Sequence, residues 1–181
     1  MTSETSSPGR LENQAITAFQ EGRLEDAIDG FTAARQAFLA KGNLEKEAEM
    51  ASNLSVALLQ AEQPQEALEV IQDIPTVFLN LGDMDRAALA YGNLGSALEA
   101  CGDHDLAEVA YRHAIDLFTN LGDTEQHNYT LQALSRLQLR RGKPLEAVTT
   151  MQIGLDDQPN PNLCNRLLRR LLRLPFRLLG R

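Results

Sequence analysis

One spacing of 40 residues recurs along most of the chain. Alanines stand on this period at Ala27, Ala67, Ala107 and Ala147. Small residues follow the same period at Ala15, Ser55, Gly95 and Ser135. A chain that repeats one unit nearly four times is expected to build a stack of similar units rather than one globular core. Stacks of this kind present extended surfaces that usually bind other proteins.

The third repeat indicates what each unit contains. Two apolar series with helical spacing predict two helices, through Tyr91, Leu94, Ala97 and Leu98 and through Leu106, Ala107, Ala110, Tyr111, Ala114 and Leu117. Gly102 lies between them and suits the left-handed residue that ends a helix. Gly22 and Gly142 mark equivalent turns, whereas the second unit has Glu62 with Pro64 nearby. We therefore predict a helical hairpin in every unit.

A second signal marks where each hairpin ends. Phe38, Phe78 and Phe118 keep the period, and each is followed four residues later by a glycine, at Gly42, Gly82 and Gly122. The next residues are Asn43, Asp83 and Asp123, which suit the cap of a following helix. Pro75 is expected to interrupt and kink the second helix of the second unit.

These residues resemble the tetratricopeptide repeat (TPR) signature. The resemblance rests on Ala15, Gly22, Ala27, Phe31 and Ala34, and on Gly95, Leu98, Gly102, Ala107, Tyr111 and Ala114. The 40-residue unit resembles the longer-hairpin subgroup of that superfamily. The resemblance implies an all-α, right-handed superhelical solenoid of about four hairpins that binds proteins or peptides. It does not specify the partner.

The expected organisation has three parts. Residues 1–10 are rich in serine and threonine and are expected to be disordered. The repeat domain is expected over residues 11–158, with hairpins at about 11–43, 44–83, 84–123 and 124–158. Residues 159–181 are expected to form a basic, amphipathic C-terminal helix that begins near Asn160 and Pro161.

Asparagine also keeps the 40-residue period, at Asn13, Asn53 and Asn93, while the fourth unit has Ala133. The resemblance implies that the first helix of each hairpin lines a concave groove. A side-chain amide both donates and accepts hydrogen bonds, so this column suits the backbone of an extended peptide. In the other interpretation, the asparagines satisfy backbone groups between helices.

Further residues of the first helices are expected to line the same groove. The apolar candidates are Ile16, Phe19, Val56, Leu59 and Leu89, the acidic candidates are Glu12, Glu49 and Glu99, and the fourth unit contributes Arg136 and Arg140. An apolar surface with an acidic border favours a basic, amphipathic peptide or helix.

The C-terminal residues differ from the rest in charge. Up to Pro161 the chain has 11 basic and 25 acidic residues, a net charge of −14, whereas residues 162–181 have six arginines and no acid. The candidate anchor residues are Arg166, Arg169, Arg170, Arg173, Arg177 and Phe176. This segment suits a helix that caps the stack, an anionic membrane surface, or docking on a partner or on the chain's own groove. Nucleic acid is unlikely because the acidic body would repel it.

The sequence contains no pattern typical of catalysis. Its three histidines are scattered, it has no phosphate-binding glycine loop, and it has no cluster of metal ligands. Cys101 and Cys164 lack metal or redox spacing, and no apolar run reaches the length of a membrane span. We therefore expect a cytoplasmic, non-catalytic adaptor or assembly factor without a cofactor or metal. The alternatives are a membrane-peripheral scaffold and a regulatory subunit whose tail occupies its own groove.

Overall fold

The computed structural model describes residues 7–156, and every secondary-structure element in that range is an α-helix. The all-α prediction is therefore confirmed. The chain divides into two compact units, residues 1–110 and residues 111–181, and each is described separately here. The division falls inside helix α7 (His104–Leu121). The predicted C-terminal helix at residues 159–181 lies outside the described residues.

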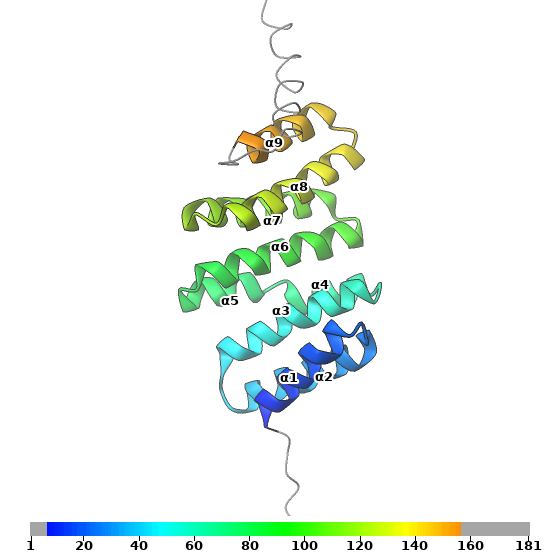
Figure 1. Ribbon diagram of the computed structural model, residues 1–181, viewed down its shortest axis with the longest axis vertical. Coiled ribbons are helices and arrows are strands. Elements are labelled where there is room, and N and C mark those ends of the chain that lie inside the picture. Colours follow the sequence, from blue (N-terminus) through cyan, green and yellow to red (C-terminus); the bar gives the residue numbers. More distant parts are fainter. Residues whose placement is uncertain (1–6, 157–181) are drawn as a thin grey trace, which may run out of the picture. The chain divides into compact units, whose positions relative to one another are not determined.

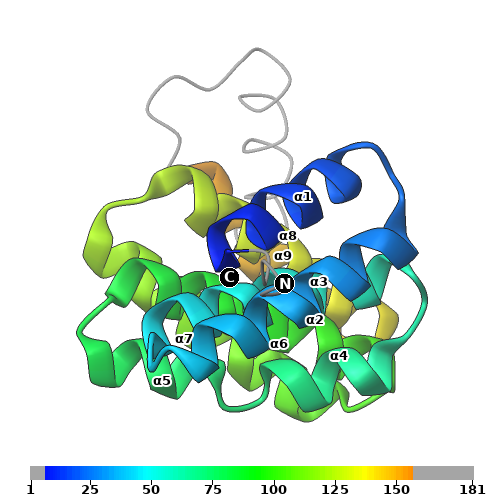
Figure 2. The same cartoon turned by 90° about the horizontal axis from the view of Figure 1, so that it is seen from below.

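The first unit contains six complete helices within the described residues: α1 (Pro8–Gln20), α2 (Leu24–Ala40), α3 (Leu44–Gln60), α4 (Pro64–Ile71), α5 (Ile74–Leu81) and α6 (Met84–Cys101). Helix α1 packs on α2, and α2 packs on α3. Helix α3 also contacts α4, α5 and α6 (Figures 1 and 2). The chain thus forms successive helical hairpins that pack against their neighbours in sequence order.

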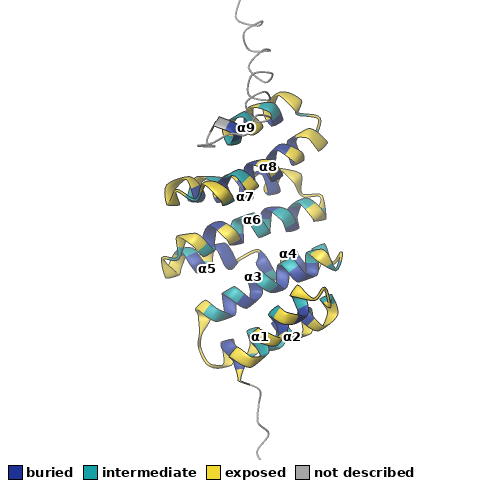
Figure 3. Cartoon of the chain, viewed as in Figure 1, coloured by how far each residue is buried: buried dark blue, intermediate teal, exposed yellow. Residues whose placement is uncertain are grey.

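The core of this unit is rich in alanine and includes the periodic small residues. Ala15, Ala27, Ala67 and Ala107 are fully buried, and Phe31 and Phe78 are almost fully buried. Figure 3 shows buried and exposed faces alternating along the helices. Helices α1 and α2 approach closely, since a β-carbon at Gly30 would lie 2.8 Å from the Ala15 β-carbon. Alanine and glycine recur because larger side chains would separate the paired helices.

The turns follow the sequence signals closely. Six glycines, at positions 22, 42, 82, 102, 122 and 142, adopt positive φ angles between 69° and 89°. Glu62 takes the equivalent place in the second hairpin with φ of 59°, a left-handed conformation that costs free energy in a residue with a β-carbon. The predicted caps are also confirmed. The side chains of Asn43, Asp83 and Asp123 each accept a hydrogen bond from the backbone N–H three residues later.

Two expectations about helix boundaries are corrected. The second helix of the second hairpin is not kinked at Pro75 but divided, because α4 ends at Ile71 and α5 begins at Ile74. Proline lacks an N–H and is best tolerated in the first turn of a helix, which is where Pro75 lies in α5. Helix α1 begins at Pro8, inside the segment expected to be disordered. Pro8 is buried, and its fixed φ suits a helix start.

The second unit contains the hairpin formed by α8 (Thr124–Arg140) and α9 (Pro144–Asp156), which pack against each other. Its interior is partly polar. The Ser135 hydroxyl donates to the Ala147 carbonyl oxygen at 3.1 Å, and the Thr150 hydroxyl donates to Gln138 Oε1 at 2.8 Å. Both hydrogen bonds are buried, so they join α8 to α9 without exposure to water.

Candidate functional site

The three periodic asparagines lie on the first helices of three successive hairpins in the first unit. Asn13 is exposed on α1, while Asn53 on α3 and Asn93 on α6 are half-buried. Helices α3 and α6 pack on each other. Asn93 Nδ2 donates a hydrogen bond of 3.0 Å to the Ser52 hydroxyl, so this amide joins α6 to α3. The asparagine column therefore includes both exposed and inter-helix members.

The apolar side chains expected beside the asparagines are partly exposed to solvent. Ile16 and Phe19 on α1 and Val56 and Leu59 on α3 are half-buried, and Leu89 on α6 is 45% exposed. Phe19 also packs edge-on against Phe31, with ring centroids 6.4 Å apart. Partly exposed apolar side chains beside amides suit contact with another polypeptide. We call this set, with the three asparagines, the asparagine face: Asn13, Ile16, Phe19, Asn53, Val56, Leu59, Leu89 and Asn93.

A row of ion pairs borders the asparagine face. Lys46 Nζ lies 2.8 Å from Glu12 Oε1, and this ion pair joins α3 to α1. Lys46 Nζ also lies 3.2 Å from Glu49 Oε2 on its own helix. Arg86 on α6 reaches back to α3, where its Nη1 lies 2.6 Å from Glu45 Oε1 and 3.9 Å from Glu49 Oε2. The expected acidic border thus contains two cations, and the sequence interpretation missed them. Their 40-residue spacing was the available signal.

The same contacts shift the proton affinities of the two cations. The hydrogen bond to Glu12 is the largest cause that raises the pKa of Lys46, with a smaller contribution from Glu49. The hydrogen bond to Glu45 is the largest cause that raises the pKa of Arg86, ahead of the charges of Glu49 and Asp83. Both side chains therefore carry a full positive charge near neutral pH. We call the row of Glu12, Glu45, Lys46, Glu49, Asp83 and Arg86 the charged rim.

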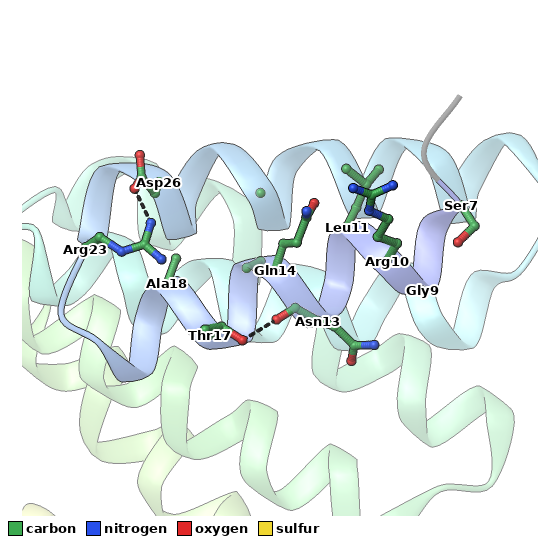
Figure 4. Close-up of a pocket in the computed structure, with 12 residues that line it drawn as sticks. Ser7, Gly9, Arg10, Leu11, Asn13, Gln14, Thr17, Ala18, Arg23 and Asp26 are labelled. Carbon is green, nitrogen blue, oxygen red and sulfur yellow. Dashed lines mark hydrogen bonds and ion pairs between the residues drawn. The ribbon is translucent and has the colours of Figure 1, made fainter. Parts of the chain in front are cut away.

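A hollow of about 860 Å³ opens between α1 and α2 (Figure 4). Small residues, including Ala15, Ala18 and Gly30, line part of it. Figure 4 shows Gln14 and Asn13 pointing to different sides of α1. The Asn13 backbone carbonyl accepts a hydrogen bond of 2.9 Å from the Thr17 hydroxyl, and the Asn13 side chain points away from Thr17.

The remaining candidate residues lie elsewhere in the chain. Glu99 is half-buried near the end of α6. Arg136 and Arg140 are exposed on α8, in the second unit. The tail candidates lie outside the described residues, so Arg166, Arg169, Arg170, Arg173, Phe176 and Arg177 stay predictions.

Cys101 is half-buried, and its Sγ contacts the Pro64 carbonyl oxygen at 3.3 Å. Burial is the main cause that raises the pKa of its thiol, and the charge of Asp103 adds to the effect. A raised pKa lowers the thiolate fraction and hence the reactivity. Among residues 7–156, no group of three or more metal-binding side chains comes together. No helix in that range is long and apolar enough to cross a membrane.

Comparison with known proteins finds a family match in part of the chain and a shared fold over most of it. Residues 85–153 match the tetratricopeptide repeat family model. No curated protein matches the chain in sequence. The chain is similar in structure to BtubC (BKLC) from P. vanneervenii, with 22% identity and a TM-score of 0.73 over 86% of this chain and 67% of that one.

A second similar structure is a putative kinesin light chain from Podosopora anserina with nearly identical TPR-like repeats. It has 16% identity and a TM-score of 0.76, over 96% of this chain and 90% of that one. At these identities the likeness shows the fold alone. The tetratricopeptide repeats matched at residues 85–153 and the hairpin geometry of the described residues agree with the resemblance seen in the sequence.

Proposed function

We propose that this protein is a non-catalytic adaptor or assembly factor that binds an extended peptide segment on the asparagine face. The single observation that carries the proposal is the position of Asn13, Asn53 and Asn93 on α1, α3 and α6, one in each of three successive hairpins. Repeat stacks of this superfamily commonly bind proteins or peptides. A repeated amide is suited to the repeated N–H and C=O groups of an extended backbone.

The neighbouring apolar side chains support binding of a polypeptide rather than a small polar ligand. Val56 lies three residues after Asn53, and Leu89 lies four residues before Asn93, so helical spacing keeps both near the amides. Leu59 lies three residues after Val56 and extends the apolar surface. Amides fix the ligand backbone, and apolar side chains supply the buried area that gives affinity. We expect the peptide backbone to contribute more to recognition than any particular ligand side chain.

Asn93 bears on the other interpretation, in which the asparagines hold the helices together rather than bind a ligand. Its hydrogen bond to Ser52 shows that one amide of the column joins two helices. Its Oδ1 accepts no hydrogen bond from the described residues, so the side chain retains an acceptor that a ligand N–H would fill. The Asn53 side chain makes no hydrogen bond to the described residues, so it is the better test of ligand binding alone.

The test uses the full chain with the substitutions Asn13→Ala and Asn53→Ala. Its binding to an array of random peptides is compared with that of the unaltered chain. The control carries Gln36→Ala and Asn80→Ala, which remove two exposed amides from the second helices α2 and α5. We expect the first variant to lose most of the signal and the control to keep it. Unchanged helicity and melting temperature are required of both proteins. Equal signals from variant and control would contradict the proposal.

A membrane-peripheral role for the tail is the alternative proposal, and the six arginines without an acid among residues 162–181 favour it. Clusters of four to eight basic residues bind anionic lipid surfaces. The test is co-sedimentation of the full chain, and of a truncation after Pro159, with vesicles containing phosphatidylserine at low salt. Sedimentation of neither protein would contradict this role.

A further inference from the structure

We infer that Lys46 and Arg86 are specificity-determining residues, which make the asparagine face accept an extended peptide without net positive charge. The inference rests on the proposed function and names its class of partner. The sequence alone pointed to a basic partner, because it showed acidic residues bordering the groove. The structure shows instead that these carboxylates are paired with cations.

Every carboxylate of the charged rim has a cation within ion-pair distance. Glu12 and Glu49 contact Lys46 Nζ at 2.8 and 3.2 Å, and Glu45 contacts Arg86 Nη1 at 2.6 Å. Asp83 Oδ2 lies 3.4 Å from Arg86 Nε and its Oδ1 accepts from the Arg86 backbone N–H. A basic ligand would have to displace these partners before it gained an ion pair of its own.

The backbone adds to this compensation. Lys46 and Arg86 lie in the first turns of α3 and α6, next to the caps Asn43 and Asp83. Each helix N-terminus carries a partial positive charge of roughly half a unit. The two cations offset two of the four carboxylate charges, and the two termini offset about one more. The charged rim therefore attracts a cationic peptide much less than four unpaired carboxylates would.

The rim lies on the same side of the helices as the amides. Lys46, Glu49 and Asn53 follow an i, i+3, i+7 pattern on α3, and Arg86, Leu89 and Asn93 follow it on α6. Residues at this spacing share one helix face. Seven residues of helix separate each cation from its asparagine, about 10 Å along the axis. An extended peptide of a few residues held by the amides therefore reaches the charged rim.

The two cations also link the amides to the stack. Lys46 joins α3 to α1, and Arg86 joins α6 to α3. The two cations stand 40 residues apart, and each contacts a carboxylate of the preceding hairpin, although Glu12 and Glu45 hold different places in the repeat. The cations therefore repeat with the period of the asparagine column. A change of both cations therefore alters the charge beside two of the three amides.

The test compares binding to an array of random peptides, sorted by net charge, for the full chain and for Lys46→Gln/Arg86→Gln. Each protein is measured with and without Asn13→Ala/Asn53→Ala, and the difference isolates the signal that depends on the asparagines. The matched control is Arg23→Gln/Lys41→Gln, which removes the same charge from exposed turn residues of the first unit.

For the unaltered chain we expect the asparagine-dependent signal to stay level or fall as peptide charge becomes more positive. For Lys46→Gln/Arg86→Gln we expect a rise of about three- to tenfold for basic peptides at low salt, lost at about 1 M salt because charges are then screened beyond ~3 Å. The control should behave like the unaltered chain. If it rises equally, or if the rim variant does not rise, the inference is wrong while the proposed function stands.

Loss of the asparagine-dependent signal in every protein would overturn both proposals together. A second variant guards against damage to folding. Glu12→Gln/Lys46→Gln removes a cation and its carboxylate partner, so the net charge is unchanged. We expect its dependence on peptide charge to match that of the unaltered chain. A strong new preference for basic peptides in this variant would show that loss of the ion pair, rather than the rim charge, controls selection.

Discussion

The first and last hairpins of the described chain fill equivalent positions in different ways. In the α1–α2 hairpin, Ala18 and Gly30 are small and apolar, whereas Gln138 and Thr150 occupy the same repeat positions in α8–α9, 120 residues later. Gln138 is 1% exposed and receives the hydrogen bond from Thr150. One hairpin thus depends on close backbone approach and the other on a satisfied polar pair.

The two hairpins share their turn geometry but differ in the residues that fill their interiors. Both hairpins turn at a glycine with positive φ, 74° at Gly22 and 71° at Gly142. The turns fix the course of the backbone, and the interior accepts either small residues or hydrogen-bonded polar ones. A buried polar pair restricts the packing more than alanine does, since each group must meet its partner.

The largest expected effect concerns the small-residue hairpin. Gly30→Val places a branched side chain where even a β-carbon would lie 2.8 Å from that of Ala15. We expect a loss of about 2–3 kcal/mol in the free energy of unfolding, because the helices must separate. Urea denaturation with hydrogen exchange of the α1 amides measures it. Gly92 on α6 is the control, because a β-carbon there meets no atom within 4 Å. A cost at Gly92→Ala equal to that at Gly30→Val would contradict the account.

The next effect concerns the polar hairpin. Thr150→Val removes the donor to Gln138 Oε1 and leaves a buried acceptor without a partner. We expect a loss of about 1–3 kcal/mol. The double variant Gln138→Leu/Thr150→Val should recover part of it, because no polar group is then stranded. A double-mutant cycle by urea denaturation gives the coupling, and strict additivity would show that the hydrogen bond does not matter.

Much of this contrast follows from sequence, but its details do not. The 40-residue period predicted the hairpins, the glycine turns and the caps at Asn43, Asp83 and Asp123, because each depends on local backbone preferences. The division of α4 from α5 was harder to predict. A proline inside an apolar helical pattern is compatible with a kink or a break, and packing against α3 and α6 decides between them.

The candidate site likewise has features that the sequence predicted and features that it did not. The asparagine period was visible in the sequence, whereas the ion pairs of Lys46 with Glu12 and of Arg86 with Glu45 join residues 34 and 41 positions apart. Such pairs depend on which helices become neighbours, so composition indicated only an acidic surface. The hydrogen bond between Gln138 and Thr150 was not predicted for the same reason, since it joins α8 to α9.

A smaller effect tests whether the two hairpins share their turns. Gly22→Ala and Gly142→Ala each place a β-carbon in the left-handed region, with no neighbouring atom within 4 Å. We expect both to lower the free energy of unfolding by a similar amount, about 1 kcal/mol, because the cost is local backbone strain. Thermal and urea denaturation measure it. Costs that differ by more than about 1 kcal/mol would show that packing, not the turn, sets the effect.

The smallest effect has the opposite sign and lies between the two hairpins. Glu62 has φ of 59° where the compared turns have glycine. Glu62→Gly removes the strain of a β-carbon in the left-handed region but increases the freedom of the unfolded chain. Because these terms partly cancel, we expect a gain of about 0.5 kcal/mol. Glu66→Gly is the matched control, since Glu66 is exposed in the first turn of α4, and it should be destabilising. A loss of stability in Glu62→Gly would mean that the Glu62 side chain makes a stabilising contribution larger than its backbone strain.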